Sequence, residues 1–316
     1  MTPTELNDLC VRKLGAAGLR DKKYVAVVGA GPSLAFIPSV DNLIAEMAKA
    51  CGVAHRIDQP TWEFFEAAFA NNEQEYCRVI RNSLGMTPYW DSRVYAQIVA
   101  MPFISFVTFN YEDQLPHAFR AKYQKDYSQR FSAYPIRPNK GWADPSDFFE
   151  QHLVAIHGYR DKNDDDWPKK IILKFSDYRD HYISDHTGRP LFYWWKQLLT
   201  SYPCLFIGTS LREPGIESVV KFLMRQQNPK FLKLEHLHLA PVSPITNQNG
   251  QASADPQYPP ADKTFGCIDK IQYDKIDARY TGLLKILEVF SGLPFEDPEP
   301  GMPAPEPITL TNQSEF

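Results

Sequence analysis

The feature that most constrains the fold of this sequence is an unbroken apolar segment, residues 24–28, that ends in Gly29, Ala30 and Gly31. A strand covered on both faces of a parallel sheet is apolar throughout, whereas a half-exposed strand alternates with polar residues. Glycine lacks a Cβ, so Gly29 and Gly31 allow a left-handed turn and the close approach of a phosphate to the N–H groups that open the next helix. The segment predicts a buried parallel strand followed by a helix. Its turn is either a nucleotide cradle or a tight structural turn.

Short apolar segments recur along the chain between stretches with helical periodicity. Strands are predicted at residues 103–109, 153–156, 204–207, 236–239 and 268–273, with a further strand or edge extension at 171–173. Helices are predicted at residues 41–50, 62–84, 94–101, 114–123, 190–202 and 214–227. Strands that alternate with helices in this way predict an α/β fold, with a Rossmann-like, mostly parallel sheet that carries helices on both faces.

The length and local composition predict one large domain with a tail. A chain of 316 residues can bury one full core, and we expect residues 1–293 to form a single Rossmann-type domain. No strand pattern interrupts residues 52–101, so we expect a helical insertion there, of the kind that commonly covers a cleft. Residues 294–316 are acidic and rich in proline, and we expect this tail to be extended.

Charge, hydropathy and cysteine spacing argue against several classes of function. The net charge is −4 without a basic block, so no direct nucleic-acid binding is expected. No apolar segment is long enough to span a bilayer and no secretory signal is visible, so we expect no membrane association and a cytoplasmic location. The five cysteines are scattered singly without a Cys-x-x-Cys pair, so neither a disulfide framework nor a metal site is expected.

Polar residues follow four of the predicted strands at the point where each strand ends. They are residues 29–33, 108–112, 157–158 and 208–210. The carboxyl ends of parallel strands meet at one edge of a sheet, where open α/β sheets bind their ligands. We therefore expect these four groups to form one binding site.

The four groups resemble motifs of the sirtuin-like superfamily, and within it the bacterial silent-information-regulator-like NADases that are often found in anti-phage defence. Residues 29–33 are similar to the Gly-Ala-Gly-x-Ser cofactor loop, and residues 108–112 to the Thr-x-Asn-Tyr-Asp motif, with Glu112 in place of the aspartate. Residues 157–158 are similar to the His-Gly motif, and residues 205–210 to the late strand with Gly-x-Ser. The cysteine tetrad that binds zinc in protein deacylases is absent, which favours the zinc-free NADase branch.

The resemblance implies a role for each matched residue. Asn110 and His157 correspond to the catalytic pair. Contacts with NAD+ are implied for Gly29, Ala30, Gly31, Ser33, Thr108, Tyr111, Glu112, Gly208, Thr209 and Ser210. Each residue also has a purely structural interpretation, because histidine at a strand end is commonly hydrogen-bonded in the core and Asn, Ser or Thr there commonly cap the following helix.

The chemistry of NAD+ cleavage suits an amide and an imidazole. The bond between ribose and nicotinamide has a cationic pyridinium leaving group that departs as a neutral molecule, so the paired carboxylates of an ordinary glycosidase are not needed. Asn110 can position water or a ribose hydroxyl, and His157 can accept a proton from either. The expected activity is an NAD+ glycohydrolase that releases nicotinamide and ADP-ribose, with NAD+ as substrate and no metal.

Two other functions remain open, an NAD-dependent protein deacylase and a non-catalytic sensor of NAD+ or ADP-ribose. An unregulated NADase would exhaust a shared cofactor. We therefore expect control through a homo-oligomer, a co-encoded regulatory partner such as an ATPase or nucleic-acid sensor, or both. The resemblance implies a regulated effector of anti-phage defence that acts by NAD depletion.

Overall fold

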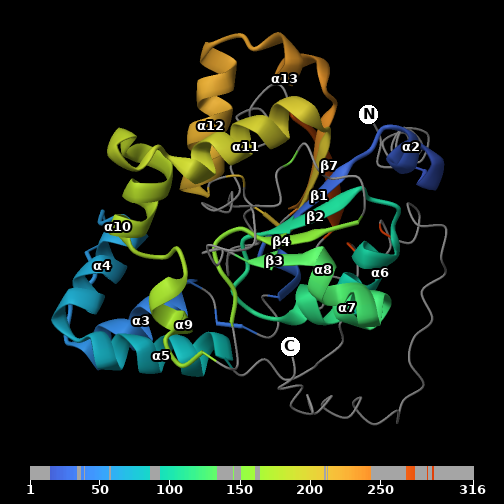
Figure 1. The fold of residues 1–316 in the computed structure, drawn as a ribbon. Helices are drawn as coiled ribbons and strands as arrows, with labels where there is room; N and C mark the ends of the chain where they lie inside the picture. The colour runs from blue at the N-terminus through green and yellow to red at the C-terminus, as the bar shows by residue number, and fades with distance from the viewer. Residues whose placement is uncertain are drawn as a thin grey trace, which may run out of the picture.

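The computed structural model of the chain contains a single parallel sheet (Figure 1). It describes residues 15–33, 37–38, 40–56, 58–85, 93–133, 145, 151–160, 164–209, 211, 213–242 and 268–274, together with Leu283 and Leu287. Within this part of the chain the strands are β1 (Val25–Val28), β2 (Ser105–Thr108), β3 (Phe131–Ala133), β4 (Leu153–Ala155), β5 (Cys204–Ile207), β6 (His236–Val242) and β7 (Ile268–Asp274). Their order is β3-β4-β2-β1-β5-β6-β7, and every neighbouring pair is parallel. The predicted Rossmann-like α/β fold is confirmed.

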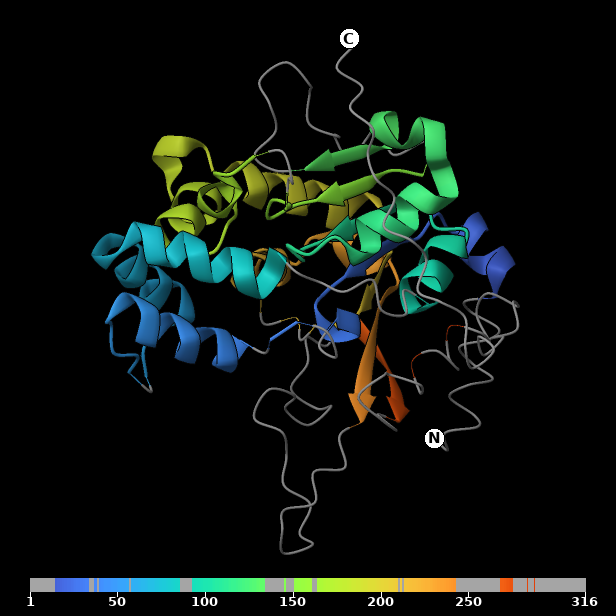
Figure 2. The same ribbon diagram turned by 90° about the horizontal axis from the view of Figure 1, so that it is seen from below.

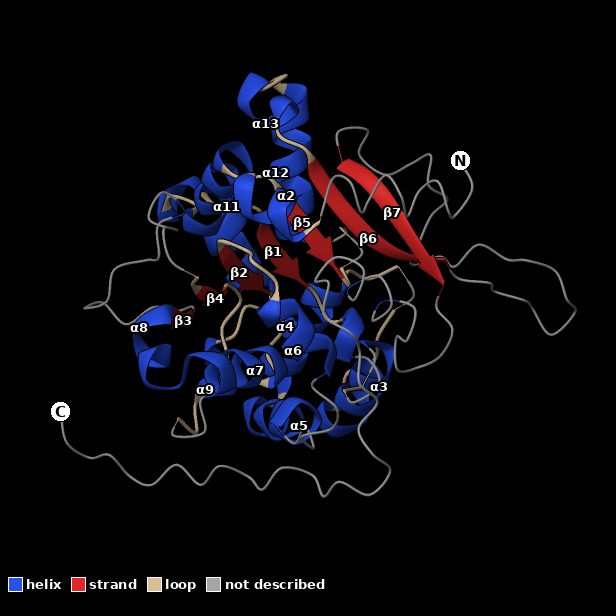
Figure 3. Cartoon of the chain, turned by 90° about the vertical axis from the view of Figure 1, so that its right-hand side faces the viewer, coloured by secondary structure: helices blue, strands red, loops and turns tan. Residues whose placement is uncertain are grey.

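Helices cover both faces of the sheet, which explains the unbroken apolar sequence of β1. Ala26 and Val28 pack with helices α2 (Ala16–Asp21), α6 (Arg93–Ala100) and α7 (Gln114–Tyr123). Val25 and Val27 face the other way, toward α11 (Pro190–Ser201), α12 (Pro214–Arg225) and α13 (Pro229–Lys233). Figure 3 shows β1, β2 and β5 with α11 and α12 on one side and α6 and α7 on the other. None of the described helices is long and apolar enough to cross a membrane.

A separate helical unit lies beside the sheet (Figures 1 and 2). It consists of α3 (Val40–Cys51), α4 (Thr61–Asn71), α5 (Glu73–Gly85), α9 (Trp167–Lys170) and α10 (Phe175–Tyr178). Its own core includes Met47, Phe64, Tyr76 and Trp167, all of them buried. The unit is therefore built from two segments that are distant in the sequence.

The packing of this unit differs from the insertion expected at residues 52–101. Helices α4 and α5 fall within that range, but α3 precedes it and joins the same core. Helix α6 ends the range, yet its Tyr95 and Ile98 pack on the sheet with α7. Helical periodicity shows that a segment has an apolar face but not which neighbour that face will cover, so the sequence could not set these limits.

One strand prediction is wrong, and one strand was not predicted. Residues 171–173 were expected to be a strand or an edge extension, but they form bends in which Ile171 and Ile172 are buried between the helical unit and the sheet. The edge strand β3 was missed, because its three residues are only half-buried and carry no apolar pattern. Residues 243–267, which follow β6, and the tail at 294–316 lie outside the described residues.

Candidate functional site

The four predicted polar groups come together at one edge of the sheet. Strand β1 is central, and the chain passes from it to β2 on one side and later returns to β5 on the other. Val28 pairs with Thr108 and with Ile207, and Thr108 pairs with Ala155, so the four strands end level with one another. The loops that follow them meet at the point where the strand order reverses, which is where ligands of open α/β sheets bind.

The glycine turn after β1 packs directly against the turn after β5. The Gly29 N–H donates to the Ile207 carbonyl at 2.9 Å, and the Gly31 N–H donates to the Gly208 carbonyl at 2.7 Å. A Cβ on Gly31 would lie 2.7 Å from the Gly208 Cα, closer than van der Waals contact allows. Gly208 has φ of +64°, and a Cβ there would clash with Pro32. These glycines are required by contact between the two turns.

Gly29 and Gly31 do not take the left-handed conformation that glycine allows, whereas Gly208 in the facing turn does. The two N–H groups also face the β5 turn and are not available to a phosphate. Ala30, between them, is exposed. Its N–H makes no hydrogen bond within the described part of the chain.

Asn110 belongs to a buried hydrogen-bond network on the α6 side of the sheet. Its Nδ2 donates to the Gly29 carbonyl at 3.0 Å and to Glu112 Oε1 at 2.8 Å, and lies 3.3 Å from the Tyr95 hydroxyl. Ser33 Oγ donates to the same Glu112 Oε1 at 2.5 Å and also contacts the Tyr95 hydroxyl. The amide nitrogen is thus fully engaged, and Oδ1 accepts no hydrogen bond among the described residues. This oxygen is the part of Asn110 that can bind water or a sugar hydroxyl.

Glu112 holds this network together. Only 1% of it is exposed, and its Oε2 accepts the Gln114 N–H at 2.6 Å. Burial raises the pKa of its carboxyl, while hydrogen bonds from Ser33, Gln114 and Asn110 act in the opposite direction. A further member of the network, Tyr95 on α6, was not predicted from the sequence.

Thr108 and Thr209 have structural partners. Thr108 Oγ1 donates to the Val28 carbonyl at 3.0 Å and accepts the Asn110 N–H at 3.0 Å, so it joins the ends of β1 and β2. Thr209 Oγ1 accepts the Leu211 N–H at 3.2 Å, within the turn, whereas the following helix α12 is capped by Glu213, so the suggested helix-capping role of Thr209 is wrong. The remaining predicted contact, Ser210, lies outside the described residues.

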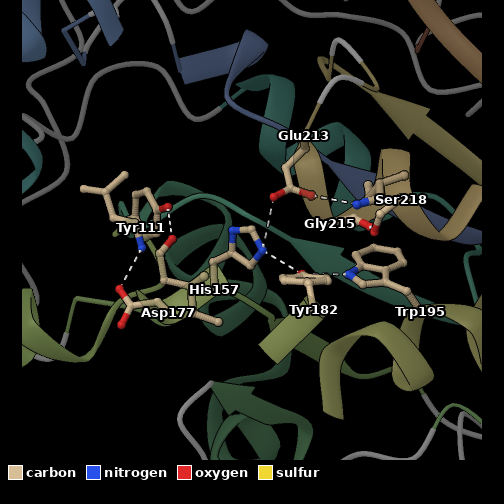
Figure 4. A network of polar contacts seen from close by, with 11 residues as sticks. Tyr111, His157, Asp177, Tyr182, Trp195, Glu213, Gly215 and Ser218 are labelled. Atoms are coloured by element: carbon tan, nitrogen blue, oxygen red, sulfur yellow. Dashed lines mark hydrogen bonds and ion pairs between the residues drawn. The ribbon is translucent and has the colours of Figure 1, made fainter. Parts of the chain in front are cut away.

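His157 lies in a second network, on the α11 side of the sheet (Figure 4). Its Nε2 is 2.8 Å from the Tyr182 hydroxyl, which also accepts the Trp195 Nε1–H at 3.3 Å. The rings of Phe109 and Tyr178 meet the imidazole edge to face. His157 is 1% exposed, and burial lowers its pKa to about 3, with the neighbouring imidazole of His181 acting in the same direction. The imidazole is therefore neutral at physiological pH and able to accept a proton.

A second carboxylate, Glu213, reaches this network from the loop before α12. Its Oε2 accepts the Ile216 N–H at 2.9 Å and caps the helix, while Oε1 lies 3.6 Å from His157 Nε2. Burial raises the pKa of Glu213 to about 7. Glu213 was not predicted from the sequence, because the proline that follows it indicates only the start of a helix. Tyr111, by contrast, donates to the Ile172 carbonyl at 2.6 Å and packs against the helical unit.

Asn110 and His157 are neighbours in the sheet but their side chains enter different networks. Each lies two residues beyond the paired positions Thr108 and Ala155, and the Ile156 N–H still donates to the Thr108 carbonyl at 2.9 Å. The Asn110 amide turns toward β1 and α6, and the His157 ring turns toward the π-helix η4 (Arg179–Ile183) and α11. The carboxyl edge of the sheet thus carries a hydrogen-bond acceptor, Asn110 Oδ1, toward one face and a base, the His157 imidazole, toward the other.

Comparison with protein families finds a match over part of the chain. Residues 104–255 match the family model of the SIR2-like domain. The chain carries a SIR2-like domain. This match confirms the resemblance to the sirtuin-like superfamily and indicates NAD-related activity. The matched residues include Asn110, His157 and Glu213 and begin after the glycine turn of β1. The comparison with curated proteins found no match to this chain. Its described residues include no group of three or more His, Cys, Asp or Glu side chains arranged to hold a metal ion.

Proposed function

We propose that this sirtuin-like protein is an NAD+ glycohydrolase that breaks the bond between ribose and nicotinamide. The observation that carries the proposal is the pair at the ends of β2 and β4, where Asn110 offers a fixed amide oxygen and His157 a neutral imidazole. Both belong to loops at the reversal of strand order, and both lie within the SIR2-like domain.

Each residue has a distinct role in this reaction. The Asn110 Oδ1 accepts a hydrogen bond from water or a ribose hydroxyl and orients it, since the Nδ2 is held by Gly29 and Glu112. His157 takes the proton that this group loses. Positioning of the reacting groups can lower the activation free energy by about 7–11 kcal/mol. Proton transfer by a side chain typically raises the rate by about a hundred- to ten-thousand-fold, which is a smaller effect, so orientation by Asn110 contributes more.

The burial of the pair supports control of the activity. His157 is 1% exposed and Asn110 is 6% exposed, so a substrate reaches them only when surrounding side chains move. We propose that a homo-oligomer or a co-encoded partner, an ATPase or a nucleic-acid sensor, favours the open arrangement and that the protein is a cytoplasmic effector of anti-phage defence. Such control would prevent unregulated loss of NAD+.

The test is chromatography of NAD+ incubated with the purified protein and with Asn110→Ala and His157→Ala. Nicotinamide and ADP-ribose are expected from the wild type, and a loss of at least about a hundred-fold from His157→Ala, the lower end of the range for proton transfer. His236→Ala is the matched control, because His236 is an equally buried histidine at the first residue of β6, away from the carboxyl edge. Equal turnover by the wild type and His157→Ala refutes the proposal.

Two further measurements decide between the alternatives. Conversion of an acyl-lysine peptide only in the presence of NAD+ assigns a deacylase instead. Calorimetric binding of NAD+ without turnover, unchanged in His157→Ala, assigns a non-catalytic sensor.

A further inference from the structure

Glu213 is an unusual choice for the residue that caps α12. A cap needs a single acceptor oxygen, and the short side chains Ser, Thr, Asp and Asn are preferred there. Glu213 fills this need with Oε2, which accepts the Ile216 N–H at 2.9 Å. Its extra methylene group carries the second oxygen beyond the helix end toward His157 (Figure 4). The longer side chain thus reaches a position that a cap alone does not require.

That second oxygen is buried without a hydrogen bond. Glu213 Oε1 has no hydrogen-bond partner of good geometry among the described residues, although the nearby Tyr178 hydroxyl acts on the carboxyl as a donor that lowers its pKa. The group near this oxygen that can become a cation is the His157 imidazole, with Nε2 at 3.6 Å. Leaving a buried acceptor unpaired destabilises a protein, and does so more strongly when the group is charged. Such an exception in a folded protein calls for an explanation.

The hydrogens of the second network explain why the oxygen is unpaired. Trp195 Nε1 can only donate, so the Tyr182 oxygen accepts from it at 3.3 Å. The Tyr182 proton is then directed at His157 Nε2, 2.8 Å away. Neutral His157 therefore presents a lone pair at Nε2 and nothing for Glu213 to accept. Once Nε2 binds a proton, the imidazolium cation of His157 and the carboxylate of Glu213 lie 3.6 Å apart and attract each other.

We propose that Glu213 is a positioning residue that stabilises the protonated imidazole of His157 during NAD+ cleavage. This inference rests on the proposed function. Water takes the place of the Tyr182 hydroxyl beside His157 Nε2 and gives one proton to that nitrogen, and the water oxygen uses the freed electron pair to bond the ribose carbon. The electrons of the broken carbon–nitrogen bond leave with neutral nicotinamide, and the imidazolium, held by Glu213, later returns the proton to solvent.

The surroundings of Glu213 suit this role. Burial raises its pKa to about 7, so it changes between acid and carboxylate near neutral pH. The titratable groups around Glu213 and His157 are Tyr111, Tyr178, Tyr182, His181 and Glu217. Burial raises the pKa of Tyr178 and of Tyr111 and lowers that of His181, so these three stay uncharged at neutral pH. Glu213 is therefore the group in contact with His157 that gains a charge in this range.

The experiment compares the pH dependence of kcat and KM for the wild type, Glu213→Gln and Glu213→Asp. Glutamine keeps an oxygen for the cap but cannot become an anion. Replacing a residue that orients a metal-ligating histidine typically lowers activity by about 10- to 100-fold. We expect kcat to fall by about the same factor in Glu213→Gln, with KM unchanged. In the wild type, activity should rise with pH near pH 7 as Glu213 becomes a carboxylate. This rise should be absent from Glu213→Gln and partly restored in Glu213→Asp.

The control is Asn228→Ala, which removes another helix cap. Asn228 Oδ1 accepts the N–H groups of Lys230 and Phe231 at the start of α13, so the variant loses comparable stability without touching His157. Its kcat and pH profile should match the wild type. A wild-type profile in Glu213→Gln, or the same loss in Asn228→Ala, overturns the inference.

A measurement without turnover separates this inference from the proposed function. In the full chain labelled with 15N histidine, the His157 ring resonances should shift with a midpoint near pH 7 in the wild type, following Glu213. This step should be absent from Glu213→Gln. If the wild type leaves NAD+ intact but the step is present, the proposed function fails while the coupling of the two residues stands. If the step persists in Glu213→Gln, the coupling itself is refuted.

Discussion

Replacing Glu213 with glutamine is expected to change how the stability of the protein depends on pH. The pKa of this carboxyl is about 7 in the fold, against 4.5 for an ordinary glutamate. Between these values the folded protein binds more protons than the unfolded chain, so the free energy of unfolding falls as pH rises. The stabilisation is fully present below pH about 4.5 and is lost as pH rises through about 7.

The size of the effect follows from the difference between the two pKa values. Each pH unit of that difference is worth 1.36 kcal/mol, which gives about 3 kcal/mol over the whole range. The Glu213 side chain is 15% exposed, and part of the range lies below pH 5, so about 2 kcal/mol is expected between pH 5 and pH 8. Glutamine does not titrate and still offers an oxygen to Ile216. The wild type should therefore lose about 2 kcal/mol relative to Glu213→Gln over this interval.

Urea unfolding of both proteins at pH 5 and pH 8 provides the measurement. His157, whose pKa is lowered to about 3, loses stabilisation as pH falls below its ordinary value of 6.5, but it does so in both proteins and cancels in the comparison. Asn228→Ala serves as the control, because its difference from the wild type should stay constant with pH. If the difference between wild type and Glu213→Gln is also constant, the carboxyl is not held in its neutral form and the reasoning is refuted.

Three other substitutions test the geometry of the site. Gly208→Ala should lower the free energy of unfolding in urea by about 2 kcal/mol or more, because the added Cβ would clash with Pro32. Gly188→Ala is the control, because Gly188 has a similar φ but lies in open space, and it should lower the free energy of unfolding by only about 1 kcal/mol. Equal losses in the two variants would contradict the account of the two turns. Thr108→Val removes two buried hydrogen bonds and should cost about 1–3 kcal/mol in the same assay, whereas a neutral effect would show that strand ends are held otherwise. Tyr182→Phe removes the donor that favours neutral imidazole, so the pKa of His157 should rise in an NMR titration, and an unchanged pKa would argue against the hydrogen bond.

The central part of the fold could be predicted because burial on both faces leaves a clear mark in the sequence. β1 and β5 are apolar at every position, and each is covered by helices on two sides. The same rule fails where burial has another cause. Ile171 and Ile172 are as buried as a central strand, yet they connect the helical unit to the sheet. The edge strand β3 fails in the opposite way, since half-buried residues carry no apolar run.

The site could be predicted as far as strand ends determine it. Asn110 and His157 follow neighbouring strands, so parallel pairing alone brings them to one edge. Tyr95, Tyr182 and Glu213 come from a helix, a π-helix and a loop, and their approach depends on how those elements pack. No local pattern records such packing, so the partners of the two predicted residues become visible only in the structure.

The glycine turn shows why a matched motif does not by itself reveal its physical cause. Gly29 and Gly31 suggest room for a phosphate, but the space that a Cβ would fill is occupied by the β5 turn, and both N–H groups are bonded to it. A substitution at either glycine would therefore separate β1 from β5 and disturb the whole edge, so lost NAD+ binding in such a variant would say nothing about a direct contact. Ala30 is the exposed residue of this turn, and its N–H is unbonded within the described chain. A direct contact between this turn and a phosphate would have to use the Ala30 N–H, unless the two turns first separate.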